Sequence, residues 1–388
     1  NNMAVATDAF KISDIDGVLK PVFDELQDVY KHNYPLQRDF GFAKVGKERS
    51  FPVLVTMGHG ATYDDGTGGA FSLANPIPAV TKEAKVTPTI IVDRQYAAWS
   101  AISRTAGGGE VAVTPALALV MSNLMDSHAY RQECSHMYGG QSLVRVTGIS
   151  GTGTARVLTL DNASFAPGIV AKMQNAQIDC YDDSVGTTKI NTNAVISVTN
   201  MSISDSDKTL TVSGNSTDLG ALDTEVGGGD AHIFFANSKG LTSTGLATIA
   251  GSTGTLFNIA GGTYHMWQAN NHTVNGQLSF GAGMAGLQKP FNRGVVGEDY
   301  TLYCSGASWH DLNNDAAALL QVPSQKDSFK IGTKEISYVS AIGSLTVKPS
   351  QFCKAGEAYA VLPRLLKRIG SAEVGKGVPG APGNANWL

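Results

Sequence analysis

The sequence has few charged residues, few cysteines and no long apolar run. Only 16% of its 388 residues are Asp, Glu, Lys or Arg, whereas 44 are glycine. This composition favours strands and tight turns over a helical bundle, and a hydrophobic content of 42% argues against disorder. The length allows two or three packed units. We therefore predict an α+β fold with much β-structure.

The cysteines and the missing targeting signals bear on where the protein is made. The four cysteines lie far apart and form no CxxC pair: Cys134, Cys180, Cys304 and Cys353. Their spacing favours reduced, structural thiols and synthesis in the cytoplasm. The apolar run Val111–Met121 is followed by polar residues and is too short to cross a bilayer. Asn1–Phe10 lacks the charged start and apolar core of a signal peptide, so neither membrane insertion nor secretion is expected.

One long helix is predicted at Thr114–Tyr138. Thr114 can cap its first turn, Pro115 suits the first helical position, and Gly139-Gly140 supply a left-handed exit. The first half is apolar on nearly every side, whereas after Asp126 only a narrow apolar stripe remains, formed by Tyr130, Cys134 and Met137. We expect the helix to enter a core with its first half and to emerge from it with its second.

An extended hairpin is predicted between Phe40 and Val92. Two β-type runs, Ser50–Thr56 and Ala84–Val92, flank a long stretch of glycine, proline and turn formers that cannot build a core of its own. A loop of this length usually has a function or is mobile. Asp64 and its neighbour lack the spacing of a calcium loop. Before this arm, a helix is expected to begin near Lys20, and after it a short helix at Tyr96–Arg104.

The remaining chain alternates strands and turns. Six β-type runs predict a small antiparallel barrel or sandwich within residues 141–237: Ser142–Thr147, Ala155–Leu160, Ile169–Cys180, Ala194–Ser204, Lys208–Ser213 and Ala231–Ala236. Further on, aromatic anchors including Trp267 precede a buried-strand pattern at Tyr300–Ser305, a helix at Ser308–Leu320, and strands within Glu335–Val347 and Ala358–Leu362. The irregular Gly/Pro-rich tail ends near Trp387, which we expect to dock on another subunit.

No catalytic or cofactor site is predicted. Gly281–Gly286 reads GAGMAG, but it lacks the preceding strand and the later acidic residue of a dinucleotide fingerprint. Gly148–Gly153 lacks the lysine of a phosphate-binding loop, and no nucleophile elbow is present. His128 and His136 are eight residues apart, which is unsuitable for a shared metal. The net charge of −4 gives no global basic field for nucleic acid. We expect no enzyme, no metal and no cofactor.

The order of these elements resembles the major capsid proteins of tailed bacteriophages, which have the Hong Kong 97-type fold. The segments that carry the resemblance are IIVDRQYAAWSAISR (90–104), LVMSNLMDSHAYRQECSHMYGG (119–140), FAPGIVAKM (165–173), GGTYHMWQANN (261–271) and IGSLTVKPSQFCKAGEAYAVLPRLLKRIG (342–370). The resemblance implies an N-terminal arm (1–39), an extended loop (40–93), a peripheral domain with its spine helix (94–140), an inserted β-barrel-like domain (141–237), an axial domain with the rest of the peripheral domain (238–373), and a tail (374–388).

The resemblance also implies a function, contact residues and partners. The protein would be a coat protein that assembles in the bacterial cytoplasm into the icosahedral shell around double-stranded DNA. Its partners would be copies of itself in hexameric and pentameric capsomers, a portal, and scaffolding or cement proteins. Implied inter-subunit contacts are Phe23, Tyr30, His59, Tyr63, Asp64, Phe71, Lys82, Lys85 and Trp387. Nonspecific DNA contact would fall to Arg364, Lys367 and Arg368. The polar half of the long helix would run along an edge where subunits meet.

A second class of function stays open at this point. Another β-rich virion component, such as a tail or decoration protein, would share the β-content and would use the β-domain as its binding part. The form of the assembled particle separates the two, because a coat protein forms a closed shell.

Overall fold

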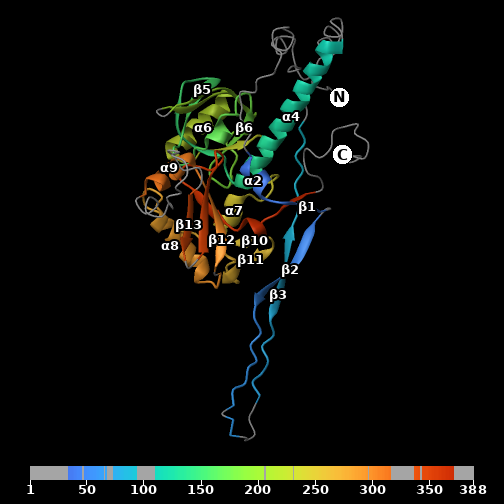
Figure 1. Ribbon diagram of the computed structural model, residues 1–388. Coiled ribbons are helices and arrows are strands. Elements are labelled where there is room, and N and C mark those ends of the chain that lie inside the picture. The colour runs from blue at the N-terminus through green and yellow to red at the C-terminus, as the bar shows by residue number, and fades with distance from the viewer. Residues whose placement is uncertain are drawn as a thin grey trace, which may run out of the picture. The chain divides into compact units, whose positions relative to one another are not determined.

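The computed structural model describes residues 34–45, 48–64, 66–67, 73–93, 110–204, 207–229, 231–295, 297–315, 336–340 and 343–370, with the backbone alone for 110–122 (Figure 1). The described chain forms two compact units, one from the described parts of 1–38 and 90–133 and one from 39–89 and 134–371. The predicted helices near Lys20 and at Tyr96–Arg104, the tail, and the contact residues Phe23, Tyr30, Phe71 and Trp387 lie outside the described residues.

The first unit contains most of α4 (Glu110–Tyr138) and the start of α2 (Pro35–Asp39). The carboxylate of Glu133, which is fully buried, accepts the backbone N–H groups of Leu36 at 2.8 Å and Gln37 at 3.2 Å. These are the free N–H groups at the start of α2, so Glu133 caps this helix from a distant position in the sequence. A short helix of five residues is thereby held against a long one.

Helix α4 differs from its prediction at both halves. It begins at Glu110, so Thr114 is not its cap. Pro115 lies in the second turn, so the hydrogen bond that its missing N–H removes is one to the first turn only. The predicted exit is confirmed, since Gly140 has a φ of 84°. The second half does not emerge from the core as predicted: its apolar stripe is buried, but so are Glu133 and Tyr138. Its position at an edge between subunits stays a prediction. Polar groups are buried here because each has a hydrogen-bond partner.

Six antiparallel strands of the second unit close into a barrel in the order β4-β5-β8-β7-β6-β9. They are β4 (Val144–Ser150), β5 (Ala155–Leu160), β6 (Gln177–Tyr181), β7 (Ile196–Ile203), β8 (Lys208–Ser213) and β9 (Ala231–Phe235). Alternate residues point inward, and Val146, Leu158 and Ile233 have no exposed surface. All six lie within residues 141–237.

Two helices accompany the barrel. The run Ile169–Cys180 was expected to be one strand, but α5 (Pro167–Val170) occupies its start and β6 follows later, because Pro167 takes the first helical position. Helix α6 (Ser216–Gly228) was not predicted. Its signals are present, since Asn215 caps it through the N–H of Thr217 at 2.8 Å and Gly229 ends it with a φ of 89°. The buried residues Leu219, Leu222 and Val226 also have helical spacing, so the sequence did contain the signal.

The second unit also contains a four-stranded sheet in the order β13-β14-β12-β15. Its strands are β12 (Glu298–Cys304), β13 (Ile336–Ser340), β14 (Gly343–Pro349) and β15 (Ala358–Val361), and they confirm the strands predicted there. β12 and β14 are parallel, and the other pairs are antiparallel. Helices α8 (Phe280–Phe291) and α9 (Gly306–Asn314) accompany the sheet, and Phe280, Leu287 and Leu312 join its core.

Short elements link the sheet to the rest of the second unit. β1 (Phe42–Lys44) pairs in parallel with β16 (Arg368–Gly370). The Asp39 carboxylate accepts the Tyr303 hydroxyl and the Lys348 ammonium, both at 2.9 Å. The remaining elements are α7 (Leu246–Gly251), β10 (Thr255–Leu256), β11 (Ile259–Ala260), and the 3-10 turns η2 (His265–Trp267) and η3 (Pro363–Leu365).

Candidate functional site

The second unit has a two-stranded arm that does not form part of the core of that unit. β2 (Arg49–Thr56) and β3 (Val80–Val86) form an antiparallel hairpin with a bulge near its outer end, between Leu54 and Thr56. β3 starts earlier and ends earlier than predicted, because Pro88 cannot continue the ladder. Beyond the strands the two chains remain together: His59 and Ile77 exchange both backbone hydrogen bonds, at 2.9 and 2.7 Å. The arm in Figure 1 is therefore paired well past its regular strands.

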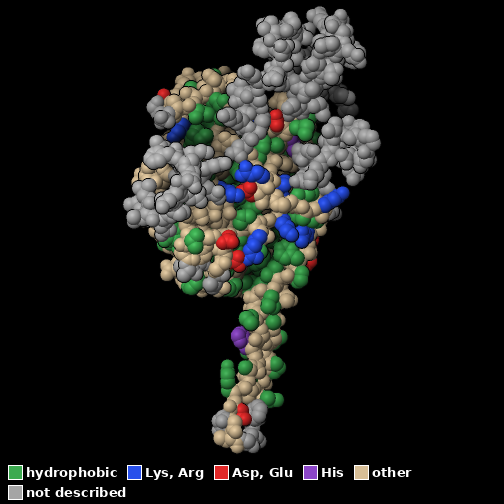
Figure 2. Space-filling model, in the orientation of Figure 1, with side chains coloured by type: hydrophobic (Ala, Val, Ile, Leu, Met, Phe, Trp, Pro, Cys, Tyr) green, Lys and Arg blue, Asp and Glu red, His purple; other side chains and the backbone are tan. Residues whose placement is uncertain are grey.

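Large apolar side chains project from this arm into solvent. Their exposed fractions are 59% for Leu54, 73% for Met57, 93% for Tyr63, 76% for Leu73 and 60% for Ile77. Figure 2 shows hydrophobic side chains standing out along the arm. An isolated two-stranded hairpin is at best marginally stable in water and has no interior in which to bury such groups. Exposed apolar surface of this kind is typical of contact sites for other macromolecules, so the outer arm is the candidate functional site.

The base of the arm is bound to its own unit. Ala84 is fully buried, although the residues on either side of it are exposed. The backbone N–H of Lys85 donates to the carbonyl of Phe257 at 3.0 Å, and the Lys82 ammonium lies 6.0 Å from the centre of the Tyr264 ring. The base is thus anchored, and the outer part is free to contact a partner.

The predicted contact residues of the arm fall into two groups. His59, Tyr63 and Asp64 lie in the outer part and are exposed. Lys82 and Lys85 lie in the base, where Lys85 is within ion-pair distance of Glu48 at 3.6 Å and Glu83 at 3.7 Å. Of the exposed apolar residues of the outer arm, only Tyr63 was predicted from the sequence. The others were not found, because exposure decides their role and the sequence does not reveal it.

Comparison with known proteins adds one result on the fold. No protein-family model matches the sequence, and no curated protein matches it. A chain of a solved structure, the cyanophage A-1(L) capsid asymmetric unit, has a similar fold. The TM-score is 0.52 at 13% sequence identity, and the match covers 91% of this chain and 77% of that one. The present chain therefore has a mixed helix-and-sheet fold similar to that of a phage capsid chain.

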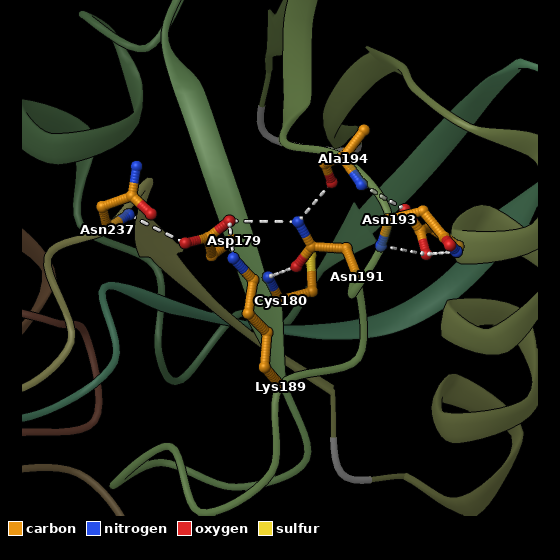
Figure 3. A network of polar contacts seen from close by, with 8 residues as sticks. Asp179, Cys180, Lys189, Asn191, Asn193, Ala194 and Asn237 are labelled. Carbon is orange, nitrogen blue, oxygen red and sulfur yellow. Dashed lines mark hydrogen bonds and ion pairs between the residues drawn. The ribbon is translucent and has the colours of Figure 1, made fainter.

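A buried polar network lies in the barrel (Figure 3). Asp179 is almost fully buried, and its carboxylate accepts from Lys189 Nζ at 2.8 Å, Asn191 Nδ2 at 3.0 Å and the N–H of Asn237 at 2.8 Å. Burial alone would raise the pKa of Asp179, but these donors together hold it below its ordinary value. Asn191 also accepts the N–H of Cys180 at 2.8 Å. Each polar atom is satisfied, so the network fastens the loop between β6 and β7 to the barrel.

A second carboxylate holds the end of the same loop. Asp218, at the start of α6, accepts the N–H groups of Asn193 at 3.2 Å and Ala194 at 2.9 Å, and the side-chain amide of Asn193 at 2.7 Å. Burial raises its pKa and these hydrogen bonds lower it, with a net decrease. These contacts make Asp218 a structural anchor for the loop between β6 and β7.

Other titratable groups are also engaged in contacts within their own unit. In the first unit, His128 Nδ1 lies 2.6 Å from Asp93, and Arg131 lies 4.0 Å from the same carboxylate. The His128 hydrogen bond is the main reason why the pKa of Asp93 is lowered. No cluster of three or more His, Cys, Asp or Glu side chains suited to a metal ion occurs within the described residues. The GAGMAG segment lies inside α8, which Ser279 caps.

The predicted basic cluster has partners within the second unit. Arg364 pairs with Glu298, and Arg368 Nε donates to the Phe40 carbonyl at 2.9 Å. Lys367 is exposed. Contact of this cluster with DNA stays a prediction.

Among the described residues, no helix combines the length and the apolar character that a membrane span requires.

Proposed function

We propose that this chain is the major capsid protein of a tailed bacteriophage, with a Hong Kong 97-type fold, and that copies of it assemble into the icosahedral shell around the genome. The observation that carries the proposal is the arm, which exposes large apolar side chains while its base is anchored. The similar fold of a cyanophage capsid chain supports the same conclusion. In this proposal the outer arm is buried by a second copy of the chain, in hexameric and pentameric capsomers.

The proposal assigns roles to the parts of the chain. Residues 40–93 act as the extended loop, the four-stranded sheet belongs to the axial domain, and the barrel is an insertion. Outer-arm residues His59, Tyr63 and Asp64 contact the neighbouring copy, as do Phe23, Tyr30, Phe71 and Trp387. The portal and scaffolding or cement proteins are further partners, and the packaged DNA is held nonspecifically near Lys367. The protein is a structural component of the virion and has no enzymatic role.

Shortening the arm tests the proposal. His59 and Ile77 form a doubly hydrogen-bonded antiparallel pair, the geometry that flanks a two-residue hairpin turn. Replacing residues 60–76 with Asn-Gly should therefore close the arm without disturbing its base. We expect this variant to fold with an unchanged urea midpoint and to form no shells in electron micrographs, whereas the parent forms closed shells. Normal shells from the variant would contradict the proposal.

A second variant tests the apolar character of the arm at its full length. The double substitution Tyr63→Ser and Leu73→Ser keeps the full arm but removes two of its most exposed apolar side chains. Impaired assembly is expected here too, because these groups are proposed to be buried by the neighbour. A tube, trimer or monomer from the parent protein would favour the tail or decoration protein instead.

A further inference from the structure

The short hairpin β10–β11 contains an unusual turn. Its two connecting residues, Phe257 and Asn258, have φ values of 49° and 70°. Leu256 and Ile259 are paired on either side, so the connection is a two-residue turn with both residues in the left-handed region. Asparagine adopts this conformation readily, but a bulky side chain such as that of Phe257 does so rarely. A hairpin of four paired residues cannot hold this turn by itself.

Contacts on two sides hold the turn in place. On its own side, the indole N–H of Trp267 donates to the carbonyl of Leu256 at 3.0 Å. On the other side, the carbonyl of Phe257 accepts the backbone N–H of Lys85 at 3.0 Å. This N–H belongs to β3 and points away from β2. The turn therefore binds the edge of β3 that is not paired with β2.

Two side chains of β3 lie near the residue that binds the turn. Ala84, next to Lys85, is fully buried within a strand whose other residues are mostly exposed. Lys82, on the same face of the strand, lies over the ring of Tyr264, in the segment that follows β11. Residues 255–267 therefore contact the base of the arm through the backbone edge of β3 and a cation–π pair, and β11 lies next to β3, the strand in which Ala84 is buried.

We propose that the β10–β11 hairpin is a brace that fixes the direction in which the arm leaves its own chain. The strained turn is retained because its carbonyl occupies the free edge of β3, which would otherwise be open to solvent. The role of this brace rests on the proposed function, because an arm that must reach a neighbouring copy needs a defined direction. The brace itself is a contact within one chain, so it is testable without assembly.

The test is to remove the Lys85 N–H alone. Lys85→Pro deletes this donor, and because the N–H bonds outside the hairpin, the pairing of β2 and β3 loses nothing at that residue. Lys85→Ala is the matched control, since it removes the ammonium and its ion pairs but keeps the N–H. Spin labels on Thr81→Cys in the arm and Ala285→Cys in α8 report the direction of the arm. The four native cysteines are buried and will not compete for the label.

Pulsed electron paramagnetic resonance on the unassembled full-length chain gives the distance distribution between the two spin labels. We expect one narrow distribution in the parent and in Lys85→Ala, and a clearly broader one in Lys85→Pro. An unchanged distribution in Lys85→Pro would overturn the proposal, and so would equal broadening in both variants, because the Lys85 side chain and not its N–H would then fix the arm. Shell formation plays no part in this measurement, so its failure is distinct from failure of the proposed function.

A second variant keeps the test valid if proline prevents folding. Ala84→Leu adds three carbon atoms at a fully buried position and should force the arm from the brace while leaving the Lys85 N–H in place. The same broadening is expected. Thr81→Leu, at an exposed position of the same strand and without the spin label there, is its folding control. A narrow distribution in Ala84→Leu, measured with the label moved to Leu54→Cys, would overturn the brace.

Discussion

Lys354 contacts Tyr138 twice. Its backbone N–H donates to the tyrosine hydroxyl at 2.8 Å, and its ammonium lies 4.2 Å from the centre of the ring. The ammonium also donates to the carbonyl of Ser142 at 2.9 Å, and all three residues are buried. Tyr138 ends α4, Ser142 precedes β4, and Lys354 lies between β14 and β15. One lysine therefore joins the helix end, the root of the barrel and the sheet.

Removing this ammonium should destabilise the protein. Lys354→Met keeps most of the aliphatic stem but leaves the Ser142 carbonyl without its donor and removes the cation–π contact, so we expect a loss of about 2–3 kcal/mol. Lys348→Met is the matched control, because its ammonium is part-exposed in its pair with Asp39, and about 1 kcal/mol or less is expected. Urea unfolding measures both. Equal urea midpoints for the two variants would show that the buried ammonium of Lys354 contributes no more to stability than the part-exposed ammonium of Lys348.

Gly139 should tolerate no side chain. A Cβ built there would lie 1.8 Å from the carbonyl oxygen of Ser243, and one built on Gly245 would lie 2.3 Å from the backbone nitrogen of Gly139. The chain entering the barrel and the chain leaving it meet here backbone to backbone. We expect Gly139→Ala to cost more than about 3 kcal/mol or to prevent folding. Gly227→Ala, in open space within α6, should instead stabilise by about 0.5–1 kcal/mol. Thermal unfolding of both variants checks the contrast.

The strands of the barrel were predictable because their alternation reflects one buried face. The predicted run Ala155–Leu160 matches β5 at both ends, and Lys208–Ser213 matches β8. The start of α4 was missed because Thr and Pro gave a false local signal inside a longer helix. Local capping patterns compete with tertiary context, and here the context prevailed.

The candidate site was predictable as an arm but not in its details. Glycine and proline around residues 58–78 revealed a segment without a core, whereas the anchoring of its base depends on Phe257 and Tyr264, far away in sequence. Trp267 was expected to be a core anchor, but it is only part-buried and bonds to Leu256. Aromatic content signals burial only on average, because it cannot tell which side of a ring is covered.

His136 should make the protein less stable in acid. Burial, with a smaller contribution from Arg368, lowers the pKa of His136 from 6.5 to about 4. As the pH falls from about 6.5 to 4, the unfolded chain therefore takes up a proton that the folded chain does not, and the free energy of unfolding decreases by up to about 3 kcal/mol. His136→Gln should flatten this part of the curve in urea unfolding from pH 7 to 4. A slope that is the same in parent and variant would exclude His136 as its source.

The buried thiols should make it less stable in alkali. Burial raises the pKa of Cys180 and of Cys304 from 9.0 to about 12, and Asp179 adds to the effect at Cys180. Between pH 9 and 12 the unfolded chain loses these protons while the folded chain keeps them, so the free energy of unfolding falls as the pH rises. Lys354 acts in the opposite direction, because burial lowers its pKa and its desolvation cost is relieved as it deprotonates. Burial also raises the pKa of Cys353, which adds to the loss at high pH. The double variant Cys180→Ala and Cys304→Ala should retain more of its stability between pH 9 and 11 in reducing buffer, and parallel curves for variant and parent would contradict this assignment.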